Sequence, residues 1–174
     1  RAKLYSPPMH RVPILMAAGG PKSATLAGTK ADGVITSVRE PATTIERVID
    51  PVRSAAAAAG RPSPTVLASR WSIRAQNEDQ AWTALGAWRG LRAPGRLEAV
   101  DPQDLRERAD AMPRQEILGM YSLVDSAADY IEVYSPLIED VGADIVAIQT
   151  TSLDQPATIA MVGEEVLPAL RKLG

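Results

Sequence analysis

The chain alternates short apolar runs with longer stretches in which apolar residues recur at helical spacing. The apolar runs predict strands at residues 12–16, from residue 34, at 65–74 and at 144–149. The stretches between and after them predict one helix that begins at Pro21. Further helices are predicted at residues 43–59, 78–92, 102–110, 113–120, 126–142 and 156–173. Because strands and helices alternate four times, the pattern predicts an α/β fold with a parallel sheet and right-handed crossovers.

Polar and proline residues sharpen several of these helix boundaries. Candidate N-caps are Thr43 or Thr44, Asn77, Asp101 and Ser126, the last with Asp129 three residues on. Pro51 is expected to kink or divide its helix, and Pro136 to break the middle of its own. The stripe of Trp82, Leu85, Trp88 and Leu91 predicts a buried helix face.

The turn after the first strand is rich in glycine and leads directly into a helix. Gly19 and Gly20 precede Pro21, which suits the first helical position because its missing N–H is not needed there. The first amides of a helix have no internal partners and lie at the positive end of its dipole, so they attract anions. This spacing is compatible with a phosphate site to which Lys22 adds charge, or with nothing more than a tight strand-to-helix turn.

These motifs also carry a resemblance to a known family. The residues that carry it are Ile14–Lys22 (ILMAAGGPK), Leu26–Gly28, Ala31–Gly33, Ala109–Pro113 and Leu167–Gly174. Together they resemble the luciferase-like superfamily of flavin and deazaflavin oxidoreductases, and within it the branch that uses coenzyme F420, typified by F420-dependent glucose-6-phosphate dehydrogenases. The resemblance implies a homodimeric oxidoreductase that acts on a small-molecule substrate. The sequence shows no apolar run of membrane-spanning length and no secretion signal, which predicts a cytoplasmic location.

Members of this family are (β/α)8 TIM barrels, and the resemblance covers only their second half. We therefore expect residues 1–174 to form the C-terminal half of such a barrel, with about four parallel strands and an irregular helical insertion at about 93–120. The N-terminal half would be absent, cleaved or supplied by another chain. A free half-barrel would leave strand edges open and its inner side chains wet. The alternative is a complete, doubly wound, flavodoxin-like sheet.

The resemblance also assigns functional residues. It implies that Gly19 and Gly20, with Lys22, bind the phosphate of the F420 side chain. In the glucose-6-phosphate dehydrogenases, three cations and a threonine bind the sugar phosphate, and the matching positions here are Thr36, Arg39, Arg96 and Met120. Methionine carries no charge and donates no hydrogen bond, so glucose 6-phosphate is a doubtful substrate. The resemblance places the acid–base residues in the missing half, so no catalytic residue is assigned.

Several readings of function remain open at this stage. The first is an F420-dependent oxidoreductase that moves hydride between the deazaflavin and an alcohol or lactol. FMN with a monooxygenase reaction, and methylene-tetrahydromethanopterin reductase, are alternatives within the superfamily. A non-catalytic half-barrel subunit or fragment is an alternative of another class. Arg70, Gln149 and Thr150, at or near strand ends, are weaker candidates for the substrate cavity.

Composition excludes other classes of site. The sequence has a formal net charge of −2 and no basic block, so it offers no footprint for nucleic acid or an anionic membrane. It contains no cysteine, which excludes disulfides, thiolate metal sites and thiol catalysis. No cluster has metal-ligand spacing, and the one histidine, His10, lies in a proline-rich segment where we expect it to be solvated.

Overall fold

A computed structural model of the chain describes residues 8–174. The chain forms two compact units, each considered by itself below. Unit 1 comprises the residues up to Ser69 together with Asp140–Val146, and unit 2 comprises Arg70–Glu139 and Ala147–Gly174. Strands β3 (Thr65–Arg74) and β5 (Ile145–Ser152), which pair with each other, contribute to both units.

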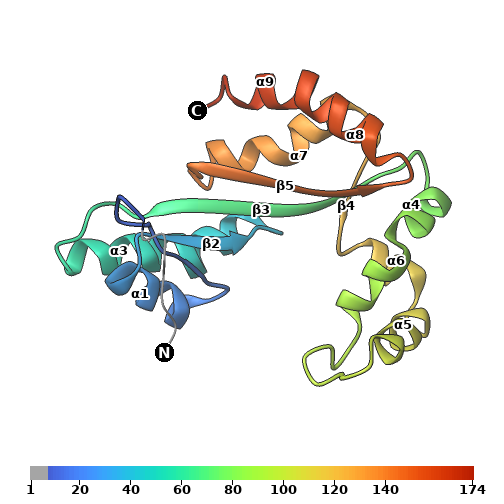
Figure 1. The fold of residues 1–174 in the computed structure, drawn as a ribbon, viewed down its shortest axis with the longest axis horizontal. Helices are drawn as coiled ribbons and strands as arrows, with labels where there is room; N and C mark the ends of the chain where they lie inside the picture. The colour runs from blue at the N-terminus through green and yellow to red at the C-terminus, as the bar shows by residue number, and fades with distance from the viewer. Residues whose placement is uncertain (1–7) are drawn as a thin grey trace. The chain divides into compact units, whose positions relative to one another are not determined.

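Unit 1 is a parallel sheet with helices on one face (Figure 1). β1 (Leu15–Ala17) pairs with β2 (Gly33–Ser37), which pairs in turn with residues 65–69 of β3. Its helical segments are α1 (Pro21–Lys30), α2 (Pro41–Thr44), the π-helical turn η1 (Ile45–Ile49) and α3 (Asp50–Ala58). Along β2, Val34 is fully buried whereas Ile35 on the opposite face is 37% exposed. The sheet of unit 1 is therefore covered on one side only.

Small residues let α1 approach its neighbours closely. Ala24 and Ala27 are fully buried, and Gly28 lies on the same face of α1 against α3. A Cβ added to Gly28 would lie 2.3 Å from the carbonyl oxygen of Val52 and 2.9 Å from Cβ of Ala55. Both α3 atoms leave no room for a methyl group, so close packing of the two helices requires glycine at this position.

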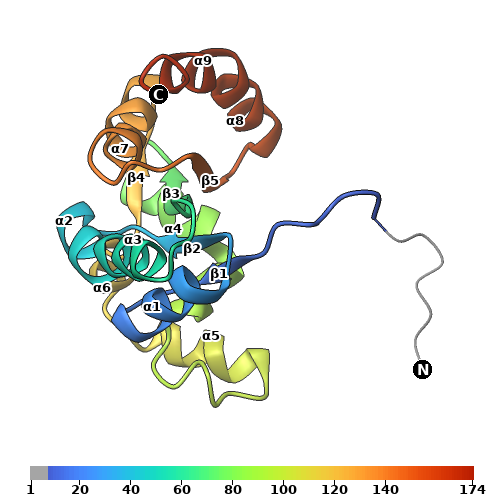
Figure 2. The ribbon, with the colours of Figure 1, turned by 90° about the vertical axis from the view of Figure 1, so that its left-hand side faces the viewer.

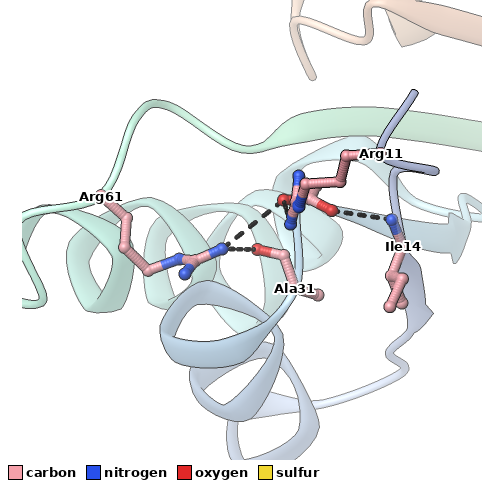
Figure 3. Close-up of polar contacts among 5 residues, drawn as sticks. Arg11, Ile14, Ala31 and Arg61 are labelled. Atoms are coloured by element: carbon pink, nitrogen blue, oxygen red, sulfur yellow. Dashed lines mark hydrogen bonds and ion pairs between the residues drawn. The ribbon is translucent and has the colours of Figure 1, made fainter. Parts of the chain in front are cut away.

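Asp32 forms several hydrogen bonds at the amino end of the sheet (Figure 3). Its Oδ2 accepts a hydrogen bond of 2.8 Å from the backbone N–H of Ile14, and its own N–H donates to the Ile14 carbonyl at 2.8 Å. Its Oδ1 accepts from Arg11 at 2.6 Å and lies 3.7 Å from Nη2 of Arg61, which donates to the Ala31 carbonyl. The side chain thus joins the start of β2 to the start of β1.

Asp144 repeats the same arrangement before β5. Its Oδ2 accepts from the N–H of Val66 at 2.8 Å, and its N–H donates to the Val66 carbonyl at 2.9 Å. An aspartate immediately before a strand therefore exchanges two hydrogen bonds with one residue of the neighbouring chain segment, twice in unit 1. Asp144 directly precedes β5 at the amino end of the strand, and these hydrogen bonds give it a structural role.

Unit 2 contains residues 70–74 of β3, residues 147–152 of β5, a short strand and several helices (Figure 2). The elements are α4 (Glu78–Leu85), the 3-10 segment η2 (Gly86–Arg92), α5 (Pro102–Asp110), α6 (Arg114–Leu118), β4 (Ser122–Val124), α7 (Ala127–Glu139), α8 (Gln155–Met161), the π-helical turn η3 (Val162–Val166) and α9 (Leu167–Leu170). β4 pairs in parallel with the end of β3. Ile73, Leu85 and Ile117 are fully buried in one core cluster of this unit. Within residues 8–174, no helix combines the length and apolar character needed to cross a membrane.

Most predicted elements are confirmed. The α/β class and parallel pairing hold, and α5 has the predicted bounds. Asn77 and Asp101 accept hydrogen bonds from the first turns of their helices, and Ser126 and Asp129 bond reciprocally as a capping box. The N-cap at Thr43 or Thr44 is wrong, because the helix begins at Pro41 after Glu40. β4 lies at the boundary of the segment predicted as helical and brings the sheet to five strands within the described residues.

The break predicted at Pro136 is wrong, whereas the segment around Pro51 is divided into α2, η1 and α3. Pro51 follows Asp50, whose N–H donates to the carbonyl of Ile45, five residues earlier, so the chain widens into η1 and continues as α3. The same arrangement precedes Pro168, where the N–H of Leu167 donates to the carbonyl of Val162. A π-turn accommodates the ring and the missing N–H of proline without ending the helix. Pro136 lies inside a continuous α7.

Gly28→Ala should destabilise the fold by about 1–3 kcal/mol, because the new methyl group would collide with the backbone of α3. Urea titration followed by circular dichroism measures the free energy of unfolding. Gly163→Ala is the matched control, since an added Cβ there meets nothing within 4 Å. Equal stability of the Gly28→Ala variant and the wild type would contradict this account of α1–α3 packing.

Asp32→Asn should remove stability that exists at neutral pH and vanishes in acid. The hydrogen bond from Arg11, followed by that from the Ile14 amide, lowers the pKa of Asp32, while desolvation opposes them. A carboxylate with a lowered folded-state pKa contributes fully above its unfolded value of about 3.9, and this contribution is lost as the pH falls through the folded value. The difference in unfolding free energy between wild type and variant should therefore shrink on acidification. Asp140→Asn, at an exposed aspartate outside this network, is the control variant.

Candidate functional site

A cavity of about 280 Å³ lies in unit 1 where the carboxyl ends of β1 and β2 meet the following helices. Its lining residues come from the turn after β1, the end of β2 and the α2–η1 segment: Gly19, Thr36, Ser37, Arg39, Glu40, Thr43, Thr44, Arg47 and Val48. Two guanidinium groups and one carboxylate are among them. This is the edge of a parallel sheet at which α/β proteins place their ligands.

The glycine turn forms one wall of this cavity. Gly20 is the N-cap of α1, with no side-chain hydrogen bond to the helix and no acidic residue in its first turn. A Cβ built on Gly19 meets nothing within 4 Å, so the space beside the turn is open. Because α1 runs for ten residues, its unpaired first-turn amides and the positive end of its dipole face outward from this turn.

Arg47 of η1 lies beside the same turn. Its Nη2 is 3.9 Å from the position that a Cβ on Gly20 would occupy. Its side chain is exposed, and within the described residues it makes no hydrogen bond or ion pair. Arg11, Arg53 and Arg61 of unit 1 differ, because each donates to an aspartate or a backbone carbonyl.

The model of the luciferase-like monooxygenase family matches residues 1–129 of this chain. The chain belongs to the luciferase-like monooxygenase family. The resemblance expected from the glycine turn is therefore confirmed.

Proteins similar to this chain include F420-dependent enzymes. An F420-dependent glucose-6-phosphate dehydrogenase of Nakamurella multipartita is 28% identical over 99% of this chain and 52% of its own length. An F420-dependent hydroxymycolic acid dehydrogenase of Mycobacterium tuberculosis is 31% identical over 97% of this chain and 46% of its own. A solved F420-dependent secondary alcohol dehydrogenase, in complex with an F420–acetone adduct, superposes with a TM-score of 0.80 at 25% identity over 98% of this chain and 52% of that one.

The chain thus spans about half the length of the luciferase-like relatives it matches. Together with the parallel sheet and its helices, this half-length match is consistent with half of a TIM barrel. The predicted fold class is confirmed at that level.

The predicted site residues are only partly brought together. Gly19, Thr36 and Arg39 line one cavity, and Gly20 adjoins it. Lys22 is exposed and is not among the lining residues. Arg96 belongs to unit 2, where it is exposed in a turn. Sequence reasoning missed Arg47, although the polar positions 40, 43, 44 and 47 have the spacing of one helix face and could have indicated it.

Met120 and the tryptophan stripe lie in unit 2. Met120 packs, partly buried, against the core cluster of that unit, as an apolar side chain should. Trp82 and Leu85 pack there too, but Trp88 is 53% exposed and Leu91 45%, so the predicted buried stripe is wrong beyond residue 85. α4 ends there because Gly86 has φ +46°, which turns the chain into the 3-10 segment η2 and changes the helical phase.

The weaker candidates at strand ends have partners within unit 2. Nε of Arg70 donates to the Ser122 hydroxyl at 3.0 Å, and the Thr150 hydroxyl lies 2.5 Å from that of Tyr130 on α7. The neighbouring Tyr134 hydroxyl donates to the Arg70 carbonyl at 2.7 Å, and burial raises its pKa to about 12. Arg70 and Thr150 thus hold β3, β4, β5 and α7 together. Gln149 keeps a buried Oε1 that accepts no hydrogen bond from any residue in the described range 8–174.

Proposed function

We propose that this chain is part of an F420-dependent oxidoreductase in which the cavity of unit 1 receives the phosphate of the cofactor. Gly19 and Gly20 bring backbone amides to the phosphate, and Lys22 adds positive charge at the start of α1. When bound, the deazaflavin supplies the hydride chemistry. The residues of this chain bind and orient it.

The observation that carries this proposal is the open side of the glycine turn. Gly20 has φ −171°, an extended backbone that any residue can adopt, and a Cβ there would make only an ordinary contact with Arg47. Neither backbone conformation nor packing requires glycine at Gly19 or Gly20. Glycine at both positions leaves the first amides of α1 open to close approach by an anion. The turn, the positive helix end and the adjacent guanidinium groups therefore fit a phosphate.

Met120 supports a substrate without a phosphate group. We assign Thr36, Arg39 and Arg96 to substrate binding, because the matching residues of the glucose-6-phosphate dehydrogenases bind their substrate. Two cations in place of three would hold a sugar phosphate weakly, because each charge-assisted hydrogen bond is typically worth about 1.5–3 kcal/mol. An alcohol or lactol, as in the secondary alcohol dehydrogenase that this chain resembles, is therefore the preferred substrate class.

The proposal includes a second half-barrel, from the same or another chain. It would cover the exposed face of β2 that carries Ile35 and would supply the acid–base groups beside the reacting carbon. A homodimer and a cytoplasmic location are further parts of this proposal. A non-catalytic half-barrel that binds phosphate without turnover remains the contrasting hypothesis.

Cofactor titration tests the proposal directly. The natural protein is titrated in separate experiments with F420 and with FMN, and absorption and fluorescence are recorded. Saturable binding of F420 in preference to FMN is expected. Preference for FMN would replace the proposal with a flavin monooxygenase, and binding without turnover of any alcohol would favour the non-catalytic alternative.

Gly20→Asp should abolish cofactor binding while the fold persists, because its carboxylate would lie beside Arg47 and repel the incoming phosphate. Gly20→Ala is the matched control, since it adds the Cβ without the charge. We expect much smaller loss of affinity for alanine than for aspartate in the F420 titration. Unchanged affinity of the aspartate variant would remove the Gly19–Gly20 turn from the site.

A further inference from the structure

We infer that Arg47, which the sequence did not single out, is the principal side-chain ligand for the cofactor phosphate at the Gly19–Gly20 turn. The inference rests on the proposed function, because it needs a phosphate-bearing cofactor at this turn. It goes further by assigning to a residue of η1 the cationic role that the family resemblance gives to Lys22.

The position of the guanidinium group carries the first step. Arg47 and Gly19 line the same cavity, and Nη2 of Arg47 stands 3.9 Å from the site of a Cβ on Gly20. An anion held by the first amides of α1 at this turn would therefore lie within reach of the guanidinium group. Lys22 is only two residues beyond Gly20, but its side chain is absent from the cavity wall.

The partners of the arginine side chains carry the second step. In the described part of unit 1, Arg11, Arg53 and Arg61 each hold a structural contact, whereas Arg47 has none. Glu40, the carboxylate that lines the same cavity, does not form an ion pair with Arg47. A guanidinium group beside an open cavity, without an acidic partner, is available to bind a phosphate through two parallel N–H donors.

The helix that bears Arg47 carries the third step. The π-turn η1 forms because Pro51 cannot donate a hydrogen bond, and it contains both Arg47 and Val48 of the cavity wall. Val48 is buried, which holds η1 against the rest of unit 1, and Arg47 is the residue directly before it. Single π-turns inside α-helices often occur at functional sites. The widened turn thus presents the guanidinium group on a segment that packing holds in place.

The test compares binding of F420 with binding of the same deazaflavin lacking the phosphate-bearing side chain, using fluorescence quenching on the natural full-length protein. Arg47→Met should weaken F420 binding about tenfold at low ionic strength, and less in high salt, because the group is exposed and screened. Binding of the phosphate-free deazaflavin should not change. Arg47→Lys should restore part of the affinity, and Lys22→Met should cost less than Arg47→Met.

Arg53→Met is the matched control, since it removes an exposed arginine of the following helix that lies outside the cavity wall. It should leave the affinity for F420 unchanged. Thermal unfolding of each variant, together with its phosphate-free deazaflavin affinity, separates a binding role from a structural one. Unchanged F420 affinity in Arg47→Met, or equal weakening of both ligands, would overturn the inference.

The outcomes distinguish this inference from the proposed function. F420 binding that is indifferent to Arg47 sustains the function and refutes the role of Arg47. If the wild type binds FMN in place of F420, the F420 function fails, and FMN and riboflavin serve as the ligand pair for the same series. Wild-type protein that binds no phosphate-bearing flavin or deazaflavin refutes both.

Discussion

Reciprocal hydrogen bonding between an aspartate and one backbone residue of the adjoining segment sets the register on which unit 1 depends. Asp32 does this with Ile14, and Asp144 does it with Val66. A slip of one residue would turn every side chain of a strand to the opposite face. Because parallel strands all run the same way, this register also places Ala17, the last residue of β1, beside Ile35 of β2. Gly19 and Thr36 therefore reach the same cavity although they follow different strands.

Sequence predicted those parts of the fold that local chemistry determines. Asn77 and Asp101 cap their helices as expected because a cap needs only an oxygen and an amide two or three residues on. The effect of a proline on a helix is less local. A missing N–H forbids one hydrogen bond, but whether the helix ends or widens depends on the burial of neighbouring side chains. Near Pro51, Val48 and Val52 are buried, and a π-turn preserves their packing. That choice is made by tertiary contacts, which a local pattern does not contain.

The residues of the candidate site likewise fall into those that local sequence can predict and those that it cannot. Residues placed by strand ends, such as Gly19, Thr36 and Arg39, could be predicted, because the carboxyl edge of a parallel sheet gathers whatever follows its strands. Arg47 could not be reached in that way, since it stands on a helix and depends on helical phase and on the true start of that helix at Pro41. Lys22 is near the turn in sequence, yet the side chains of a helix's first residues need not face the groups that its amides face.

The glycines of unit 1 show how packing and ligand binding can be told apart. At Gly28 a side chain would lie 2.3 Å from a carbonyl oxygen of α3, and at Gly33 it would lie 2.3 Å from that of Thr65, so the protein itself explains both. At Gly20 the nearest atom would be a guanidinium nitrogen 3.9 Å away, and the backbone is extended. A residue with a side chain would fit there and would cost less conformational entropy on folding. Packing within the chain does not account for glycine at that turn, whereas the proposed anion on the amides of α1, next to Arg47, would.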